Sequence, residues 1–531
     1  MIDKIFCNGN IFTQDKENPF ANAFAIAHGK IVAVGGNEEV LALRTPNTKL
    51  ETLNNKTVLP GFNDAHIHIW KVGNLLTYML DLRGVRSIDE MQQRIFDYAQ
   101  KNPQLEWIQA RGFNEALFPD ERMPTKFDLD KVISDRPVAV IRTCAHQLIV
   151  NSKALELAGI NSQSQTPAGG EIKKFESGEL KGHFTETALG LVMNKIQAYN
   201  ADQYKVMINA AQKEFLKLGI TSATDPAVMP DLLEVYYSME KNDELKVRVN
   251  AIPIRLPDGA TKALPLPKLF NSDFLNVNTV KFFADGGLSG KTAALKRPYK
   301  NSNDYGVLRL EENLFFQLAL EAQQAGFKIA THAIGDAALN LVLKVYEGIN
   351  ASATPSSLRR AGVVPHRLEH VGLPSQKNLE DMKRMNVSAV MQPIFLYELG
   401  KNFIESLDDA YLSYVYPCKT ILNYGINLSL STDAPVVKDF NPMLCIQSAV
   451  ERKDIAGNVI AATEKISVEE ALFAYTMGSA IANGDENNRG SIETGKFADF
   501  IVLDKNPFET ISSALSIIKV QSTFIGGKKV Y

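Results

Sequence analysis

Two histidines stand two positions apart in the stretch "GFNDAHIHIW", at His66 and His68, in a chain that has only eight histidines. Residues i and i+2 of a β-strand point to the same side, so a strand here would direct both imidazoles to one ligand. Imidazole nitrogen is a favoured ligand of Zn²⁺, and a catalytic zinc site keeps one position open for water. The pair indicates a metal site, although paired histidines in strands often only satisfy hydrogen bonds.

Side chains of related chemistry occur in four further apolar runs: Lys281 in "VKFFADGG", His332 in "THAIGD", His366 and His370 in "HRLEH", and Asp433 in "STDAPV". A lysine ammonium offers a metal no lone pair, but burial disfavours its charged form and leaves a nucleophilic amine. A carboxylate such as Asp433 can contact a metal and move the proton of an activated water to a leaving group. If these runs meet at one place, they predict a hydrolytic metal site.

Several of these residues also have a purely structural interpretation. Lys281 could pair with Asp285 or cap a helix, and Asp433, which shortly precedes a proline, could cap the next helix. His366 and His370 share the same side of a strand, so both are candidates for one position. His370 lies nearer the end of the run, and we expect it to be the ligand and His366 to be structural.

The elements that must position these residues follow a repeating order. Eight apolar runs alternate with amphipathic helical stretches such as "EENLFFQLALEAQQAG", and they cover 57–68, 219–228, 245–256, 276–287, 327–336, 366–373, 387–395 and 426–436. Eight such units predict an α/β fold, a (β/α)₈ TIM-like barrel. Catalytic residues of such barrels lie at the carboxyl ends of the strands, where most of the candidates fall.

Both ends of the chain differ from this middle part. The first sixty residues and the last forty-five or so consist of short β-like runs with turn residues between them. We expect residues 1–57 and 486–531 to form one small β-sandwich domain and residues 58–485 to form the barrel. Roughly 140 residues separate the first strand from the second, far more than a connecting loop needs, so residues 80–210 are expected to be an inserted subdomain.

Composition excludes several classes of protein. The chain has 531 residues, of which 45% are apolar and 22% charged, and its net charge is −3, with no basic stripe for nucleic acid or a lipid surface. Four scattered cysteines without a CxxC pair fit a reducing compartment. No run has the length of a signal peptide or a membrane span. We expect a cytoplasmic protein whose partner is a small molecule.

The motifs "LPGFNDAHIH", "VKFFADGGLSGKTAAL", "THAIGD", "RLEH", "STDAPV" and "GSIETGKFADFIVLD" together resemble the amidohydrolase superfamily, in its amidohydrolase 3, YtcJ-like branch. The resemblance covers essentially the whole chain. It implies a distorted barrel that binds one or two divalent metals, usually zinc. By motif position, His66, His68 and Asp433 would bind the first metal, and a second would be bound by Lys281, His332 and His370. The resemblance further implies that CO₂ carbamylates Lys281, whose new carboxylate bridges the two ions.

The resemblance also indicates residues that contact substrate. Asp285 and Lys291 lie in the motif after the fourth strand, where the usual family form has arginine at the position of Lys291. If this position contacts substrate, the preferred substrate differs from that of other members. His146 lies in a segment that resembles the part reaching towards the pocket, although a packing role is equally compatible. A homodimer would be in keeping with the superfamily, and the sequence leaves the oligomeric state open.

These observations predict a metal-dependent hydrolase that cleaves a C–N bond of an amide-like small molecule, such as an N-formyl or cyclic amide, with metal-activated hydroxide. Two alternatives remain open. The same metal site could carry out deaminase or esterase chemistry, or the chain could be a non-catalytic homologue that binds a metabolite. The complete set of candidate ligands favours the enzyme, and the sequence does not identify the substrate.

Overall fold

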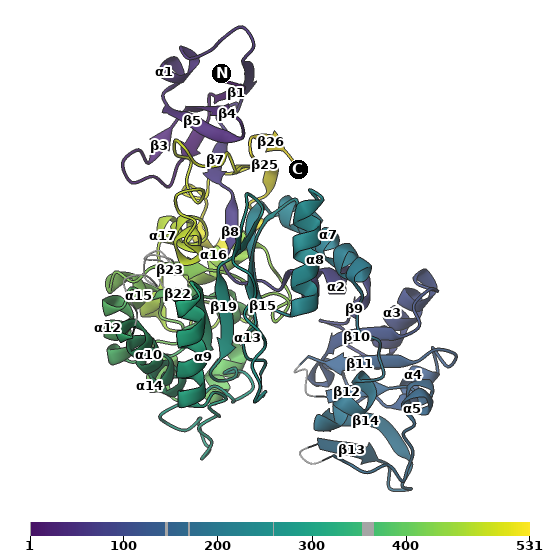
Figure 1. Cartoon of the computed structure of the whole chain (residues 1–531). Coiled ribbons are helices and arrows are strands. Elements are labelled where there is room, and N and C mark those ends of the chain that lie inside the picture. The colour runs from purple at the N-terminus through teal and green to yellow at the C-terminus, as the bar shows by residue number, and fades with distance from the viewer. Residues whose placement is uncertain (1, 144–146, 168–169, 259, 353–365) are drawn as a thin grey trace. The chain divides into compact units, whose positions relative to one another are not determined.

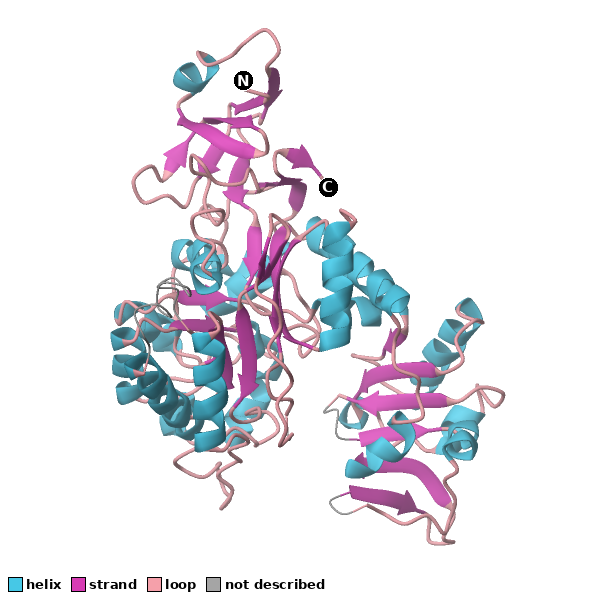
Figure 2. Cartoon of the chain, viewed as in Figure 1, coloured by secondary structure: helices cyan, strands magenta, loops and turns pink. Residues whose placement is uncertain are grey.

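The computed structural model describes residues 2–143, 147–167, 170–258, 260–352 and 366–531. They form two compact units, drawn in Figure 1 and coloured by secondary structure in Figure 2. The first unit combines Met1–Ile69 with Gln212–Tyr531, and the second is Trp70–Ala211. The insertion expected at 80–210 lies within the second unit.

Eight strands of the first unit run parallel to their neighbours in the order of the sequence. The first three are hydrogen-bonded in one group and the last five in another, and a parallel bridge between Ile254 and Lys281 joins the groups. Each predicted run contains one of them: β8 (Phe62–Asp64), β15 (Ile220–Val228), β16 (Arg248–Pro253), β19 (Thr279–Phe283), β20 (Lys328–Ala333), β21 (Arg367–His370), β22 (Ser388–Met391) and β23 (Leu428–Leu430). Two short strands, β17 (Phe270–Asn271) and β18 (Leu275–Val277), extend the first group at one edge.

Amphipathic helices separate most of these strands, and side-chain caps mark where several of them begin. The stretch "EENLFFQLALEAQQAG" forms α9, where the Glu311 carboxylate accepts hydrogen bonds from two backbone amides of the first turn. Ser375 and Ser467 begin α12 and α17 with capping boxes. The longer helices that accompany the strands are α8 (Pro230–Lys241), α9 (Glu312–Gln324), α10 (Asp336–Ala351), α12 (Gln376–Arg384), α13 (Ile394–Ser406) and α16 (Pro442–Glu451), and the shorter ones are α14 (Asp409–Leu412), α15 (Cys418–Asn423), α17 (Val468–Ala474) and α18 (Met477–Asn483). The result is a TIM-barrel-like α/β domain, with α7 (Ala201–Lys217) leading into β15.

The run predicted as the first strand is divided in two. Thr57–Pro60 forms β7, which belongs to a sheet of the terminal region, and β8 begins at Phe62. Between them stands Gly61, where a Cβ atom would lie 2.1 Å from Thr221 Oγ1. The chain therefore passes from one sheet to the other at a glycine, where any side chain would overlap Thr221.

Both termini contribute to the remaining sheets of the first unit. One has the order β5-β4-β1-β6 and the other β26-β25-β24-β7-β2-β3. Phe6, Phe24, Phe500 and Phe524 pack together in their core, with ring centroids of Phe500 and Phe524 4.3 Å apart. The strands are β1 (Lys4–Cys7), β2 (Asn10–Phe12), β3 (Phe20–Ala21), β4 (Ala23–Ala27), β5 (Lys30–Gly35), β6 (Lys49–Thr52), β24 (Phe500–Leu503), β25 (Val520–Ile525) and β26 (Lys528–Lys529), and α1 (Asn37–Leu41) lies beside them.

The second unit is built on a single sheet with the order β13-β14-β12-β11-β10-β9. The stretch "EIKKFESGELKGHF" lies in the hairpin formed by the antiparallel pair β13 and β14. The strands of the sheet are β9 (Met79–Asp81), β10 (Ile108–Phe113), β11 (Val138–Arg142), β12 (Gln147–Val150), β13 (Gly170–Lys174) and β14 (Leu180–Glu186). The helices of this region include α2 (Ile69–Thr77), α3 (Ile88–Lys101), α4 (Lys126–Asp130), α5 (Ser152–Ala158) and α6 (Gly190–Met193). Apolar residues of α3 and of β10–β12 fill the core on one face of this sheet.

Candidate metal centre

His66 and His68 lie just beyond the end of β8 and not within a strand. The strand alternation expected from the sequence therefore does not explain how they converge. Instead, backbone hydrogen bonds hold this segment: His66 N donates to Asp64 Oδ1 at 3.1 Å, and His68 N donates to Ala434 O at 2.9 Å. The two imidazole centroids lie 5.8 Å apart as a result.

Asp433 lies next to this pair because the chain after β23 is bonded to the chain after β8. Its backbone N donates to His66 O at 2.7 Å. Its Oδ1 lies 3.5 Å from His66 Nε2 and 3.3 Å from His68 Nε2. One ligand atom from each of the three residues falls within 4.8 Å of the other two, the spacing of a candidate metal site. Asp433 does not act as the cap of the next helix.

Two further histidines lie beside this set. His332, in β20, and His370, at the end of β21, have ring centroids 4.4 Å apart, and His370 lies 5.0 Å from His66. His370 has a φ of +78°, and Asp433 a φ of +55°, a conformation that residues other than glycine seldom adopt. Such backbone strain concentrates at functional sites, where surrounding contacts enforce it.

Lys281 reaches the interior from β19. Its Nζ is buried and has no hydrogen-bond partner among the described residues. Burial lowers the pKa of Lys281 to about 8, while the nearby Glu369 opposes the shift. The pairing with Asp285 that the sequence left open does not occur. A buried amine without a partner is costly, which fits a side chain that is modified or faces ions.

Burial favours the neutral, metal-binding form of three of these imidazoles. Burial lowers the pKa of His66 and of His370, and it lowers that of His332 to about 3. Neutral imidazole has a lone pair free for a cation, whereas imidazolium has none. His332 Nε2 lies 3.2 Å from Gly286 O, and because a carbonyl only accepts, this nitrogen carries the proton.

Three buried side chains that the sequence reasoning missed support these histidines. Glu369 Oε2 lies 2.5 Å from His66 Nδ1, and Gln392 Oε1 lies 2.7 Å from His370 Nδ1. Asp64 accepts hydrogen bonds from the Tyr475 hydroxyl at 2.6 Å and from Thr432 Oγ1 at 2.8 Å, while burial raises its pKa to about 6. For Glu369 the sequence contained a signal, the charged residues inside the apolar run "RLEH". A buried strand seldom carries unpaired charge, so these residues indicated a buried partner.

The residues expected to contact substrate occupy different places. Asp285 is buried, and its carboxylate accepts hydrogen bonds from the backbone amides of Ala294, Ile334 and Gly335, which tie together the segments after β19 and β20. Burial raises the pKa of Asp285 to about 7. Lys291 is exposed, and His146 lies outside the described residues. Their contacts with substrate stay predictions.

His366 lies apart from the cluster. Its Nδ1 accepts a hydrogen bond from Ile329 N at 3.2 Å, and its ring packs against Tyr346. Of the two histidines in "HRLEH", the structure thus brings His370, and not His366, to His66 and His332.

A family model described as "Amidohydrolase family" matches residues 50–531. The chain belongs to the amidohydrolase family. The putative amidohydrolase YtcJ of Bacillus subtilis (strain 168) is 30% identical over 537 residues, which cover 99% of this chain and 99% of that protein. The N-substituted formamide deformylase of Arthrobacter pascens is 25% identical over 547 residues, with coverage of 99% and 98%.

A solved structure agrees with this assignment. The uncharacterized metal-dependent hydrolase from Pyrococcus horikoshii OT3 superposes with a TM-score of 0.78 at 27% identity, over 96% of this amidohydrolase and 99% of that chain. The donor set fits the divalent metal that the family implies, because it combines neutral imidazoles, a carboxylate and a buried amine without a hydrogen-bond partner. The family and this solved structure therefore support metal-dependent hydrolysis as the activity class.

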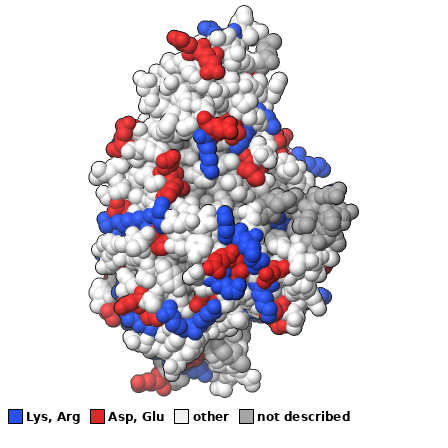
Figure 3. Space-filling model, turned by 90° about the vertical axis from the view of Figure 1, so that its left-hand side faces the viewer, with Lys and Arg blue, Asp and Glu red and all other residues white. Residues whose placement is uncertain are grey.

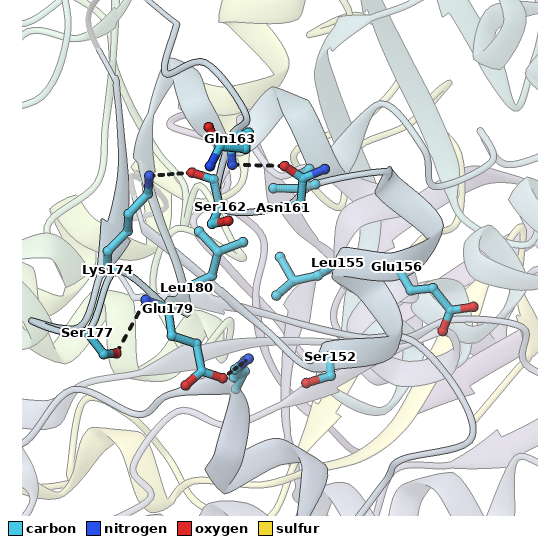
Figure 4. Close-up of a pocket in the computed structure, with 13 residues that line it drawn as sticks. Ser152, Leu155, Glu156, Asn161, Ser162, Gln163, Lys174, Ser177, Glu179 and Leu180 are labelled. Carbon is cyan, nitrogen blue, oxygen red and sulfur yellow. Dashed lines mark hydrogen bonds and ion pairs between the residues drawn. The ribbon is translucent and has the colours of Figure 1, made fainter.

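A cavity of about 810 Å³ on the second unit of this amidohydrolase does not contain this chemistry (Figure 4). Lys126 and Glu179 form an ion pair at 2.8 Å along its wall, and Lys174 Nζ donates to Ser162 O at 2.7 Å. None of the residues drawn there belongs to the candidate metal centre.

Proposed function

We propose that this protein is a metal-dependent hydrolase that cleaves a C–N bond of an amide-like small molecule. The observation that carries the proposal is the convergence of His66, His68 and Asp433 on one point, with the rings of His332 and His370 beside it. The similarity to an N-substituted formamide deformylase makes N-formyl compounds the first substrates to test, followed by cyclic amides.

The proposed ligands divide into two groups. His66, His68 and Asp433 would hold one divalent ion, for which zinc is the best candidate, and a second would be held by His332, His370 and a carbamate on Lys281. When bound, the metal supplies an activated water and polarises the substrate carbonyl. Carbamylation forms a bond between Lys281 Nζ and the carbon of CO₂ and releases one proton, so it replaces a buried amine with an anion that can face two cations.

Asp433 is the proposed proton carrier. Its Oδ1 lies within 3.5 Å of both His66 Nε2 and His68 Nε2, so its carboxylate lies beside the nitrogens that would hold the metal, where it could reach an activated water. From there it can accept the proton of the water and pass it to the departing nitrogen. An amine leaves readily only when protonated, so this transfer completes the cleavage.

The finer architecture is also proposed. The hydrogen bonds from Ala65 N to Leu430 O and from Asp433 N to His66 O support closure of the eight strands into a (β/α)₈ barrel. The shared phenylalanine core supports a β-sandwich made from residues 1–57 and 486–531. A closed barrel would hold the metal ligands on rigid elements.

A small-molecule substrate is the proposed partner, in a cytoplasmic setting. Basic and acidic side chains are interspersed on the face drawn in Figure 3, a distribution without the basic stripe that nucleic acid would need. None of the helices in the described ranges is long and apolar enough to cross a membrane.

The first experiment is elemental analysis of protein purified without chelators, combined with turnover of N-substituted formamides and other amides. We expect about two ions per chain, as in two-metal hydrolases, and about one in the Lys281→Met variant, which cannot be carbamylated. The control His28→Asn changes an exposed turn histidine with a φ of +52° and should keep the full metal content.

Other outcomes would redirect or end the proposal. Release of ammonia from a cyclic amidine, or of an alcohol from an ester, without amide cleavage would favour deaminase or esterase chemistry at the same site. Failure to bind metal after incubation with zinc and bicarbonate, together with no turnover, would favour a non-catalytic protein that binds a metabolite.

A further inference from the structure

Two of the proposed metal ligands are held by unlike partners. His66 Nδ1 lies 2.5 Å from a carboxylate oxygen of Glu369, and His370 Nδ1 lies 2.7 Å from the amide oxygen of Gln392. Both contacts are buried. Because each acceptor fixes a proton on Nδ1, each imidazole presents its Nε2 lone pair to the centre.

The partner of His66 is part of a charged buried network. Arg367 Nε donates to Glu369 Oε1 at 2.6 Å, and Arg367 Nη2 donates to Glu369 Oε2 at 3.1 Å. The guanidinium is fixed in turn by the side chain of Asn483 and the backbone oxygen of Ala65, each at 2.6 Å. Glu369 is therefore an anchored carboxylate that accepts hydrogen bonds from two directions.

The partner of His370 carries no charge. Gln392 Nε2 donates to Ser431 Oγ at 2.8 Å, and the Ser431 hydroxyl donates to Met391 O at 3.3 Å. Since the hydroxyl proton is directed at Met391, Ser431 accepts from the amide nitrogen of Gln392. This orientation leaves the amide oxygen for His370, so the contact is a neutral hydrogen bond.

A carboxylate behind a metal-binding histidine makes the imidazole a stronger donor, and loss of such a partner commonly costs 10–100-fold in metal affinity. We propose that Glu369 and Gln392 make the two halves of the metal centre unequal: the half that contains His66 binds a divalent cation more tightly than the half that contains His370. The inference rests on the proposed metal-dependent function. It assigns Glu369 and Gln392 as positioning residues, because each acts through a histidine.

Glu369 could instead serve only as the counter-charge of Arg367. The variant Glu369→Asp separates these roles, because it keeps the negative charge beside Arg367 but withdraws the carboxylate from His66. The reciprocal variant Gln392→Glu places a carboxylate behind His370, where the Ser431 hydroxyl can turn and donate to it. The two variants test the difference in metal affinity between the two halves of the centre, and they should change it in opposite directions.

The test is a titration of Co²⁺ into metal-free protein in bicarbonate buffer, followed by visible absorbance. Wild type should bind in two resolved steps. Glu369→Asp should weaken the tighter step by about 10–100-fold and leave the weaker step unchanged, whereas Gln392→Glu should tighten the weaker step. The thermal unfolding midpoint of each metal-free variant reports folding separately from metal affinity. If Glu369→Asp does not fold, the effect of Gln392→Glu on the weaker binding step tests the inference by itself.

Two equal binding steps in wild type, or an effect of Glu369→Asp on the weaker step, would overturn the inference. If a protein with equal steps hydrolyses amides, the proposed function stands and only the inequality is wrong. A protein that binds no Co²⁺ and hydrolyses nothing overturns both. A change in thermal midpoint without a change in either affinity would assign Glu369 to folding alone.

Discussion

Asp433 carries two roles in the proposed site, metal contact and proton transfer. Asp433→Asn keeps an oxygen that can face the metal but cannot accept a proton, so kcat should fall by about 10²–10⁴-fold. Measurement of kcat together with metal content separates the two roles. Asp409→Asn, at an exposed position in the first turn of α14, is the control and should leave kcat unchanged. A variant at Asp433 that retains its metal and its full kcat would exclude the proton-carrier role.

Lys328 should make stability depend on pH. Burial, and secondarily the charge of Arg367, lowers its pKa from 10.5 to about 7, although its Nζ donates to Asn483 O. Between these pH values the unfolded chain holds a proton that the folded chain lacks. Unfolding takes up that proton, and the free energy of unfolding contributed by Lys328 therefore rises with pH through this window.

The variant Lys328→Met should make this rise smaller when denaturant unfolding is measured from about pH 7 to about pH 9. Lys401→Met removes a largely exposed lysine, with 85% side-chain exposure, and should leave the pH dependence as in wild type. If Lys328→Met follows the wild-type curve, the amine is protonated in the folded chain throughout.

At the scale of single elements, the step from β7 to β8 is the most constrained. A Cβ atom at position 61 would lie 2.1 Å from Thr221 Oγ1 and 2.8 Å from Thr221 Cβ, and Thr221 lies in β15, which pairs with β8. Gly61→Ala should cost about 1–3 kcal/mol of unfolding free energy, as overpacking does. Gly287→Ala, where no heavy atom lies within 4 Å of the new Cβ, should change it by less than about 0.5 kcal/mol. Equal effects of the two variants in denaturant unfolding would show that β8 tolerates displacement.

At the scale of the first unit, a buried ion pair joins the parallel strands to the terminal sheets. Arg248, in β16, donates to both carboxylate oxygens of Asp499 at 2.5 and 2.9 Å, and both side chains are less than 5% exposed. Arg248→Met would leave the Asp499 carboxylate buried without its cation, which costs about 3–5 kcal/mol.

A double-mutant cycle in denaturant unfolding checks this coupling. The variant Arg248→Met with Asp499→Asn should lose less than the sum of the single variants, because the uncompensated charge is removed with its partner. The surface pair Lys401–Glu405, 3.8 Å apart and largely exposed, should contribute less than about 1 kcal/mol in the same assay. Strict additivity at Arg248 and Asp499 would contradict the coupling.

Local sequence patterns were sufficient to predict most of the strands and helices that position the site. Each of the eight predicted runs contains a parallel strand, and the helix predicted at "EENLFFQLALEAQQAG" is present as α9. The reason is physical, because periodicity along the chain reports which faces are buried, and burial dominates the choice of secondary structure. The same patterns also placed His332 and Lys281 on strands that enter the site.

What the sequence determined by itself was therefore the order of strands and helices and the types of residue available for a metal. Tertiary structure decided how they meet: His66 and His68 converge beyond the end of β8, and Glu369 supports His66 from another strand. The split at Gly61 and the bond from Tyr475 to Asp64 were equally absent from any local pattern. Hydrogen bonds between segments distant along the chain depend on the packed arrangement of all the strands. The periodicity of a single segment therefore does not predict them.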